Sequence, residues 1–143
     1  MTIHCPTKLS HHDSCMAEFL TVLKELGVSY RVPNEYEEAN HDRDNDDHGF
    51  DFSINGHIID FKSFGLRLIN GSATWDSNYW DAKKNPLRRG LINEFYLFRV
   101  GSDPKSWLAM RRSDLRLSTR GYGPYCWTKN LLSMYQLIRV CAN

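Results

Sequence analysis

Hydrophobic and polar positions near the start of the chain follow two different periodicities. Between residues 10 and 27 the apolar residues recur at the spacing of one helix face. Ser10 or Asp13 can cap the first turn of such a helix, and Gly27 is suited to its end. Residues 28–32 then alternate between apolar and polar side chains. The pattern predicts a helix over residues 10–27 followed by a strand over residues 28–32.

The stretch from residue 50 to residue 62 shows the alternation of two strands around a tight turn. Asn55-Gly56 is a preferred two-residue hairpin loop. With this loop, residues whose numbers add up to 111 lie opposite each other, so that Phe52 faces Ile59. One side of the predicted hairpin is therefore apolar, and we expect it to face the core.

The other side of this hairpin carries Asp51 opposite Asp60, with Lys62 two residues further along the same face. Opposed side chains have Cβ atoms roughly 4.5–5.5 Å apart, and like charges at that distance destabilise a sheet. A divalent cation between the carboxylates removes this penalty, and carboxylate oxygens suit Mg²⁺ or Mn²⁺. The residues predict a metal-dependent site that hydrolyses phosphodiester bonds. An ordinary hairpin with a solvated polar face is the alternative interpretation.

The remaining chain is expected to alternate between helices and strands. We expect a helix over 76–93, strands over 94–100 and 106–112, a glycine-rich loop over 119–125, and a final helix over 127–140. The last helix is apolar on more than one side, which is typical of a deeply packed helix or of a contact in a homodimer. The order of elements predicts one domain over residues 1–143, of the α/β class with an α+β mixed sheet.

Bulk composition indicates an ordinary globular chain. Hydrophobic residues make up 41% and charged residues 24% of its 143 residues, which excludes the disordered class. No apolar run approaches the roughly 20 residues that span a bilayer, and the N-terminus lacks the pattern of a signal peptide. We therefore expect a cytoplasmic, intracellular protein without membrane contact, whose cysteines are reduced thiols.

Charge is distributed unevenly along the chain. Residues 1–62 contain 12 acidic and 5 basic side chains, whereas residues 63–143 contain 5 acidic and 13 basic ones. Two solvated faces would explain this asymmetry, but it also fits a cation site beside a surface for phosphates. Seven basic residues, interspersed with Trp and Tyr that can stack on bases, are predicted to contact DNA, or alternatively RNA. They are Lys83, Lys84, Arg88, Arg89, Arg111, Arg112 and Arg120.

The hairpin and the helix before it resemble the PD-(D/E)XK nuclease superfamily, which includes restriction enzymes, Holliday-junction resolvases, and phage and homing endonucleases. The matching signature is Asp51 followed, after eight residues, by Asp60-Phe61-Lys62. Phe50 stands where the family name has proline. The resemblance covers roughly residues 14–112, and it implies a restriction-endonuclease-like αβββαβ core with a C-terminal helix. It also implies Mg²⁺-dependent cleavage, with catalytic roles for both carboxylates and the lysine.

Many members of this superfamily add a glutamate from the first helix as a further catalytic metal ligand. Glu18 and Glu25 are the candidates, and they share a helix face because they lie seven residues apart. Glu18 is preferred, since Glu25 lies near the end of the predicted helix. An exposed helix carboxylate is the alternative interpretation of either residue.

Two other functions remain open from the sequence. One is a non-catalytic module that binds nucleic acid or protein on a nuclease-like fold. The other is an RNA endonuclease of the cap-snatching type, which resembles the same superfamily and usually adds a histidine ligand from the first helix. His11 and His12 are expected to lie too near the start of that helix for this role. Together with Cys15 they also match no compact zinc-binding spacing.

Overall fold

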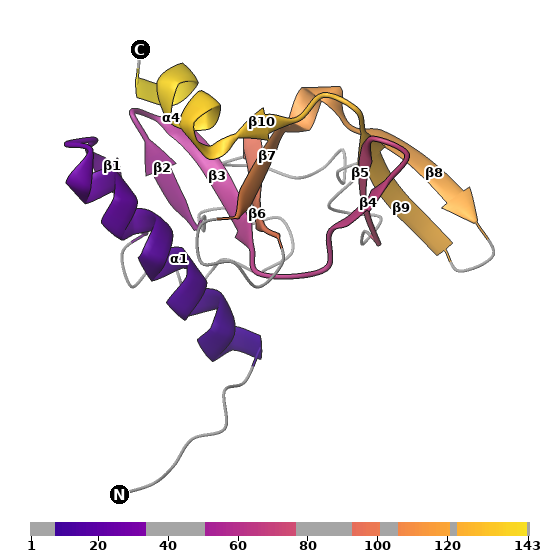
Figure 1. Ribbon diagram of the computed structural model, residues 1–143, viewed down its shortest axis with the longest axis horizontal. Helices are drawn as coiled ribbons and strands as arrows, with labels where there is room; N and C mark the ends of the chain where they lie inside the picture. Colours follow the sequence, from indigo (N-terminus) through magenta and orange to yellow (C-terminus); the bar gives the residue numbers. More distant parts are fainter. Residues whose placement is uncertain (1–7, 34–50, 77–92, 101–105, 121–122, 143) are drawn as a thin grey trace, which may run out of the picture.

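The computed structural model describes residues 8–33, 51–76, 93–100, 106–120 and 123–142. Within these ranges the chain forms two helices, a six-stranded mixed sheet and a four-stranded antiparallel sheet (Figure 1). The fold is therefore of the mixed α+β class. Neither described helix has the length and apolar character needed to cross a membrane.

The first helix, α1, spans Lys8–Glu25 and confirms the predicted helix, with a start two residues earlier than expected. Gly27 terminates it in the left-handed region of backbone space, at a φ of 72°. The Gly27 amide donates to Lys24 O at 3.1 Å, and the Val28 amide donates to Leu23 O at 2.9 Å. These two bonds form a Schellman cap, which satisfies the last carbonyl groups of the helix.

The hairpin predicted around Asn55 and Gly56 is present. The strands on its side of the sheet are β1 (Tyr30–Arg31), β2 (Phe52–Ile54) and β3 (His57–Lys62). Phe52 pairs with Ile59, which confirms the predicted register. Asn55 and Gly56 have φ values of 50° and 84°, and two positive values in succession are those of a type I′ turn. Phe50, predicted to pair with Phe61, lies outside the described residues.

The six-stranded sheet has the order β1-β2-β3-β6-β7-β10. Its further strands are β6 (Phe95–Arg99), β7 (Trp107–Arg111) and β10 (Leu132–Ser133). The strands predicted over 94–100 and 106–112 are therefore confirmed as β6 and β7. β6 runs parallel to β3, whereas the other neighbouring strands are antiparallel. The parallel pair puts the ends of β3 and β6 at the same edge of the sheet.

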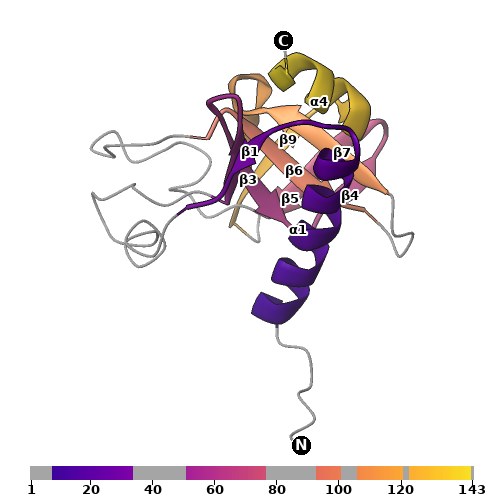
Figure 2. The same ribbon diagram turned by 90° about the vertical axis from the view of Figure 1, so that its left-hand side faces the viewer.

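Both helices cover one face of this sheet. Figure 2 shows α1 in front of the strands and α4 (Met134–Ala142) above them. The side chains between helices and sheet form one buried cluster, which includes Phe19, Leu23, Phe61, Leu97 and Leu137. Burying each such side chain stabilises the fold by roughly 1.5–3 kcal/mol relative to leaving it exposed.

The four-stranded sheet packs on the opposite face of the six-stranded sheet. Its order is β4-β5-β9-β8. The strands are β4 (Arg67–Ile69), β5 (Ser72–Asp76), β8 (Arg116–Arg120) and β9 (Gly123–Thr128), and a short 3-10 turn, η1 (Arg112–Asp114), precedes β8. Trp75 and Cys126 of this sheet pack against Tyr96, Phe98 and Met110 in a second buried cluster. The rings of Trp75 and Phe98 lie 4.8 Å apart.

One prediction for the last third of the chain is wrong, and the predicted C-terminal helix is confirmed only in its second half, as α4. The segment 119–125, predicted as a loop, contributes to β8 and β9. The helix predicted over 127–140 begins only at Met134, because Trp127 and the residue after it end β9. Pairing of β9 with β5 and β8 is a long-range interaction that overrides the local helical spacing. The helix predicted over 76–93 falls almost entirely on residues that the structure does not describe.

Candidate metal centre and active site

Asp60 and Lys62 lie on β3, on the face of the sheet opposite the helices. Ile59 and Phe61 point into the helix-covered core, so strand alternation turns the two polar side chains to the other face. Lys62 Nζ lies 4.0 Å from Asp60 Oδ2 and 5.8 Å from the centre of the Tyr96 ring. The structure therefore brings this carboxylate and this ammonium together, as the sequence predicts.

Asp51 precedes β2 and is held against the backbone of β3. The Phe61 amide donates a hydrogen bond of 2.6 Å to Asp51 Oδ2. Asp60 is the smallest of the influences on the pKa of Asp51, which it lowers, so the two carboxyl groups lie near each other. Only 17% of the Asp51 side chain is exposed, so water can compete little for its oxygens. The opposed carboxylates predicted from the hairpin register are thus brought together.

His12 completes this cluster from α1. Its Nε2 lies 2.9 Å from Phe61 O and 3.6 Å from Asp51 Oδ1, and its ring meets the edge of the Phe61 ring at a centre-to-centre distance of 5.2 Å. The expectation that His12 lies too near the helix start to reach the site is wrong. α1 begins at Lys8, so His12 is already in its second turn.

Helical spacing is the signal that could have identified His12. Cys15, Phe19 and Leu23 are buried core residues of α1, and His12 lies three, seven and eleven residues before them. Residues at these intervals share one helix face. The buried stripe of α1 therefore ends in an imidazole that points at the sheet.

The contact between His12 and Asp51 shifts the pKa of both groups. Hydrogen bonding to Asp51 is the largest effect on His12, and against desolvation it raises the pKa of His12 from 6.5 to about 9. Burial is the largest effect on Asp51 and favours its neutral form. Hydrogen bonds and charge from His12, with the hydrogen bond from the Phe61 amide, nevertheless lower the pKa of Asp51 below its usual value. At neutral pH the pair is therefore an imidazolium beside a carboxylate.

We expect this pair to make stability depend on pH. Because folding raises the pKa of His12, its contribution is complete below about pH 6.5 and is lost as the pH rises through about 9. The free energy of unfolding of the metal-free wild type should fall by on the order of 2 kcal/mol across this window, and that of His12→Asn should change much less. Urea unfolding followed by circular dichroism measures the difference. A parallel fall in both proteins would contradict the assignment.

His12, the Phe61 carbonyl and Asp51 are the groups that could hold a divalent cation. Two ligands bound at 2.0–2.1 Å and at right angles stand about 3 Å apart. The distances from His12 Nε2, 2.9 Å to Phe61 O and 3.6 Å to Asp51 Oδ1, are close to this value. No three His, Cys, Asp or Glu side chains in the described part of the chain are already grouped as metal ligands. Binding of a cation here would therefore need the Phe61 carbonyl as a ligand, and the Asp60 side chain would have to turn toward the cation.

Glu18 lies elsewhere on α1. Its Oε2 accepts a hydrogen bond of 2.8 Å from Arg99 Nη1, and the same guanidinium nitrogen donates to Cys15 Sγ at 3.1 Å. Six residues separate Glu18 from His12, which corresponds to about 240° around the helix and about 9 Å along it. His12, and not Glu18, therefore makes the contact from α1 to the carboxylate pair. The metal-binding role of Glu18 stays a prediction, as does that of the exposed Glu25.

The predicted phosphate-contacting residues are described only in part. Lys83, Lys84, Arg88 and Arg89 lie outside the described residues, as does the side chain of Arg120. The Arg111 guanidinium lies 5.2 Å from the centre of the Phe95 ring. Arg112 Nη1 donates to Asn93 Oδ1 and lies 3.5 Å from the Tyr96 hydroxyl. Both described arginines are thus engaged with the protein, and Arg111 stands at the end of β7 remote from Lys62.

Two other histidines lie apart from the carboxylate pair. His57, at the start of β3, forms a hydrogen-bonded ion pair of 2.5 Å with Glu94. His11 Nε2 lies 3.6 Å from the sulfur of the buried Cys15. Cys126 and Cys141 are buried as well, and no disulfide joins these three described cysteines. His57 provides a matched comparison for His12, since both pair with a carboxylate.

Comparisons of the chain with protein-family models, with curated proteins and with solved structures return no match.

Proposed function

We propose that this protein is a metal-dependent nuclease that hydrolyses phosphodiester bonds in DNA. The observation that carries the proposal is the contact of His12 with Asp51 at the backbone of Phe61, where His12 reaches the carbonyl and Asp51 accepts from the amide. Asp60 and Lys62 stand on either side of Phe61 in β3. A hairpin with a merely solvated polar face gives no reason to bury Asp51 against a strand and to direct a helix imidazole at it.

Mg²⁺ or Mn²⁺, when bound, supplies an acidified water and neutralises charge on the phosphate. The residues of the chain hold the cation and position the attacking water. Asp51 and Asp60 provide anionic oxygens, and the amide of Phe61 holds the Asp51 carboxylate against β3. His12 Nδ1 lies 3.4 Å from Asp13 Oδ1, which can keep the proton on Nδ1 and leave Nε2 free to act as a ligand. Lys62 orients the attacking water or stabilises the transition state through its positive charge.

A restriction-endonuclease-like core is part of the proposal. Its support is the order of α1, the β2–β3 hairpin, and then β6 parallel to β3 with β7 antiparallel beside it. The second helix that the resemblance implies would fall on residues 76–93, which are almost entirely outside the described ranges. The four-stranded sheet is additional to the αβββαβ pattern.

RNA is a second candidate substrate, and His12 is the observation that favours it. From the sequence, the early position of the histidines in the helix argues against an endonuclease of the cap-snatching type. That reason no longer holds, since His12 Nε2 reaches both Phe61 O and Asp51.

The proposal is tested with the wild type on a panel of substrates. The panel contains supercoiled, linear, single-stranded and branched DNA, together with RNA, each with Mg²⁺, Mn²⁺ or EDTA. We expect cleavage with either metal and none with EDTA, and a higher melting temperature with Mn²⁺ in the absence of substrate. Failure to cut any member of the panel with either metal would overturn the proposal. Binding without cutting would point to the non-catalytic module instead.

A further inference from the structure

On the face of the four-stranded sheet that is turned away from the six-stranded sheet, Arg67, Arg116 and Trp127 lie in one row with the buried Thr74. Arg67 pairs with Thr74, Thr74 with Trp127, and Trp127 with Arg116, so one row crosses all four strands. The neighbouring Cys126 points into the buried cluster between the two sheets. Strand alternation therefore turns the row away from the core.

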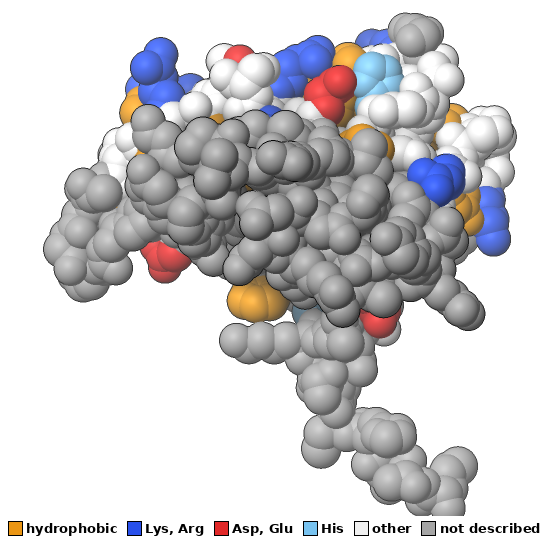
Figure 3. Space-filling model, turned by 180° about the vertical axis from the view of Figure 1, so that it is seen from behind, with side chains coloured by type: hydrophobic (Ala, Val, Ile, Leu, Met, Phe, Trp, Pro, Cys, Tyr) orange, Lys and Arg blue, Asp and Glu red, His pale blue; other side chains and the backbone are white. Residues whose placement is uncertain are grey.

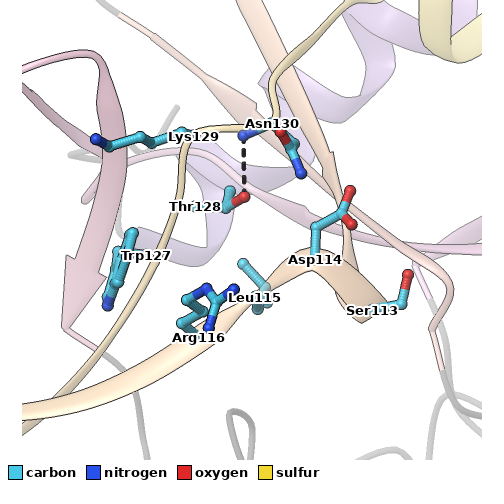
Figure 4. Close-up of a pocket in the computed structure, with 8 residues that line it drawn as sticks. All are labelled: Ser113, Asp114, Leu115, Arg116, Trp127, Thr128, Lys129 and Asn130. Atoms are coloured by element: carbon cyan, nitrogen blue, oxygen red, sulfur yellow. Dashed lines mark hydrogen bonds between the residues drawn. The ribbon is translucent and has the colours of Figure 1, made fainter.

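A pocket of about 690 Å³ opens at one end of this row. Its lining includes Asp114, Arg116, Trp127, Lys129 and Asn130 (Figure 4). Figure 4 shows Trp127, Arg116 and Lys129 grouped on one side, with Asp114 and Asn130 on the other. The volume lies within the roughly 300–1,000 Å³ of small-molecule sites. Lys and Arg side chains also lie along the upper edge of the molecule when it is seen from behind (Figure 3).

Trp127 and the backbone of the loop at Lys129 are held in place before any ligand arrives. Trp127 Nε1 donates to Ser118 Oγ at 3.0 Å, which fixes the orientation of the indole. The Arg116 guanidinium lies 6.0 Å from the centre of the indole ring system. The Asn130 amide donates to Thr128 Oγ1 at 3.0 Å, which fixes the loop that presents the exposed Lys129. A site ordered in this way loses little conformational entropy on binding.

We propose that this pocket binds one nucleotide of a single-stranded nucleic acid. A base stacks on Trp127, and the flanking phosphates contact Arg116 and Lys129. Asp114 repels phosphate, but its carboxylate can accept a hydrogen bond from a base amino group or a ribose hydroxyl. A single strand fits better than a duplex, because stacking on a side chain requires a base that is not stacked on its neighbours.

This inference rests on the proposed function and adds a second contact to the substrate. The chain enters the pocket after Arg111, the last residue of β7, which pairs with Phe95 at the start of β6. Lys62 pairs with Phe98, three residues further along β6. Three residues of strand span about 10 Å, so Arg111, just before the segment that lines the pocket, lies about that far from Lys62 along the strand direction. A strand bound at both places would be held over several nucleotides.

Fluorescence anisotropy with labelled oligonucleotides in EDTA tests the pocket independently of catalysis. The probes are a single-stranded DNA, a single-stranded RNA of the same sequence, and the corresponding DNA duplex. Arg116→Glu/Lys129→Glu should bind both single strands about tenfold more weakly than the wild type. The slope of log K against log salt should decrease by about 1.4, which is about 0.7 for each lost phosphate contact. The control, Lys24→Glu/Arg139→Glu, changes the charge equally at exposed positions on the two helices and should bind within about twofold of the wild type.

Variants at Trp127 test the stacking. Trp127→Ala should weaken single-strand binding about tenfold, and Trp127→Phe should restore most of it because a ring remains. Thermal melts show which variants fold. If the double variant does not fold, Lys129→Met provides a milder change in charge. It should weaken single-strand binding about threefold.

Three results would overturn the proposal for this pocket. They are no binding of single strands by the wild type, equal losses of affinity in the charge-reversal variant and its control, and binding of the duplex as tight as that of the single strands. Because EDTA removes any bound metal, binding can persist in a protein that never cleaves. Failure of the nuclease proposal and failure of the pocket are therefore distinguishable.

Discussion

Asp60→Asn is expected to lower the rate of metal-dependent cleavage about a thousandfold or more. Asparagine preserves the shape of the side chain but removes the negative charge that would hold the cation. Without the cation, the charge that develops on the phosphate is no longer neutralised. The free energy of unfolding without metal should stay within about 1 kcal/mol of the wild type. Asp60 is only partly buried, so the substitution disturbs little packing. Single-turnover cleavage and urea unfolding measure the two effects.

Asp76→Asn is the matched control for this prediction. Asp76 is an exposed carboxylate on β5, paired with Arg67 at 3.0 Å, and solvent screens this surface ion pair so that it adds little to stability. Its cleavage rate should be that of the wild type. Activity of Asp60→Asn within tenfold of the wild type would remove Asp60 from the site, whatever the substrate.

His12→Ala is expected to reduce cleavage by on the order of 100-fold at a fixed low metal concentration. The imidazole is the one contact between α1 and Asp51 that the structure identifies in the described residues, and a lost ligand weakens the hold on the metal. High Mn²⁺ should restore part of the rate. His57→Ala removes the imidazole of β3 that pairs with Glu94 and should leave cleavage unchanged.

A pH series separates a ligand from a purely structural histidine. Metal binding at Nε2 displaces the proton that the contact with Asp51 retains up to about pH 9. The apparent affinity of the wild type for Mn²⁺ should therefore rise about tenfold per pH unit between about pH 7 and pH 8.5. His12→Ala should show a much flatter dependence. A variant with full activity and the same pH dependence as the wild type would show that His12 only fastens α1 to the sheet.

The hairpin was predictable because its information is local. The Asn55-Gly56 turn and the alternation around it fix the register, and the register alone places Asp51 opposite Asp60. A second Asn-Gly turn carries the same signal. Asn70 and its neighbouring glycine have φ values of 49° and 79° and join β4 to β5. That hairpin went unpredicted, because its sheet is completed only by β8 and β9, far away in the sequence.

The role of His12 was harder to predict. The buried stripe of α1 includes His12 at helical spacing, but spacing does not say which strand the helix crosses. The distance to Asp51 depends on how Phe19 and Leu23 pack against the sheet, and this is a tertiary property. The sequence favours Glu18 over His12 as a metal ligand, because its carboxylate is the ligand type of the resemblance. In the structure Glu18 instead pairs with Arg99 on another side of the helix.

The parallel pairing of β3 with β6 has a consequence for how the site is assembled. The chain between Lys62 and Phe95 includes β4 and β5, and closing a loop of this length costs about 3 kcal/mol in chain entropy. The hairpin of Asp51 and Asp60, in contrast, closes through two residues and can form within microseconds. During refolding the carboxylates should therefore meet early, and Tyr96 should reach Lys62 late. Doubling the long connection costs only about 0.6 kcal/mol, so evolution can lengthen it without displacing the carboxylate pair.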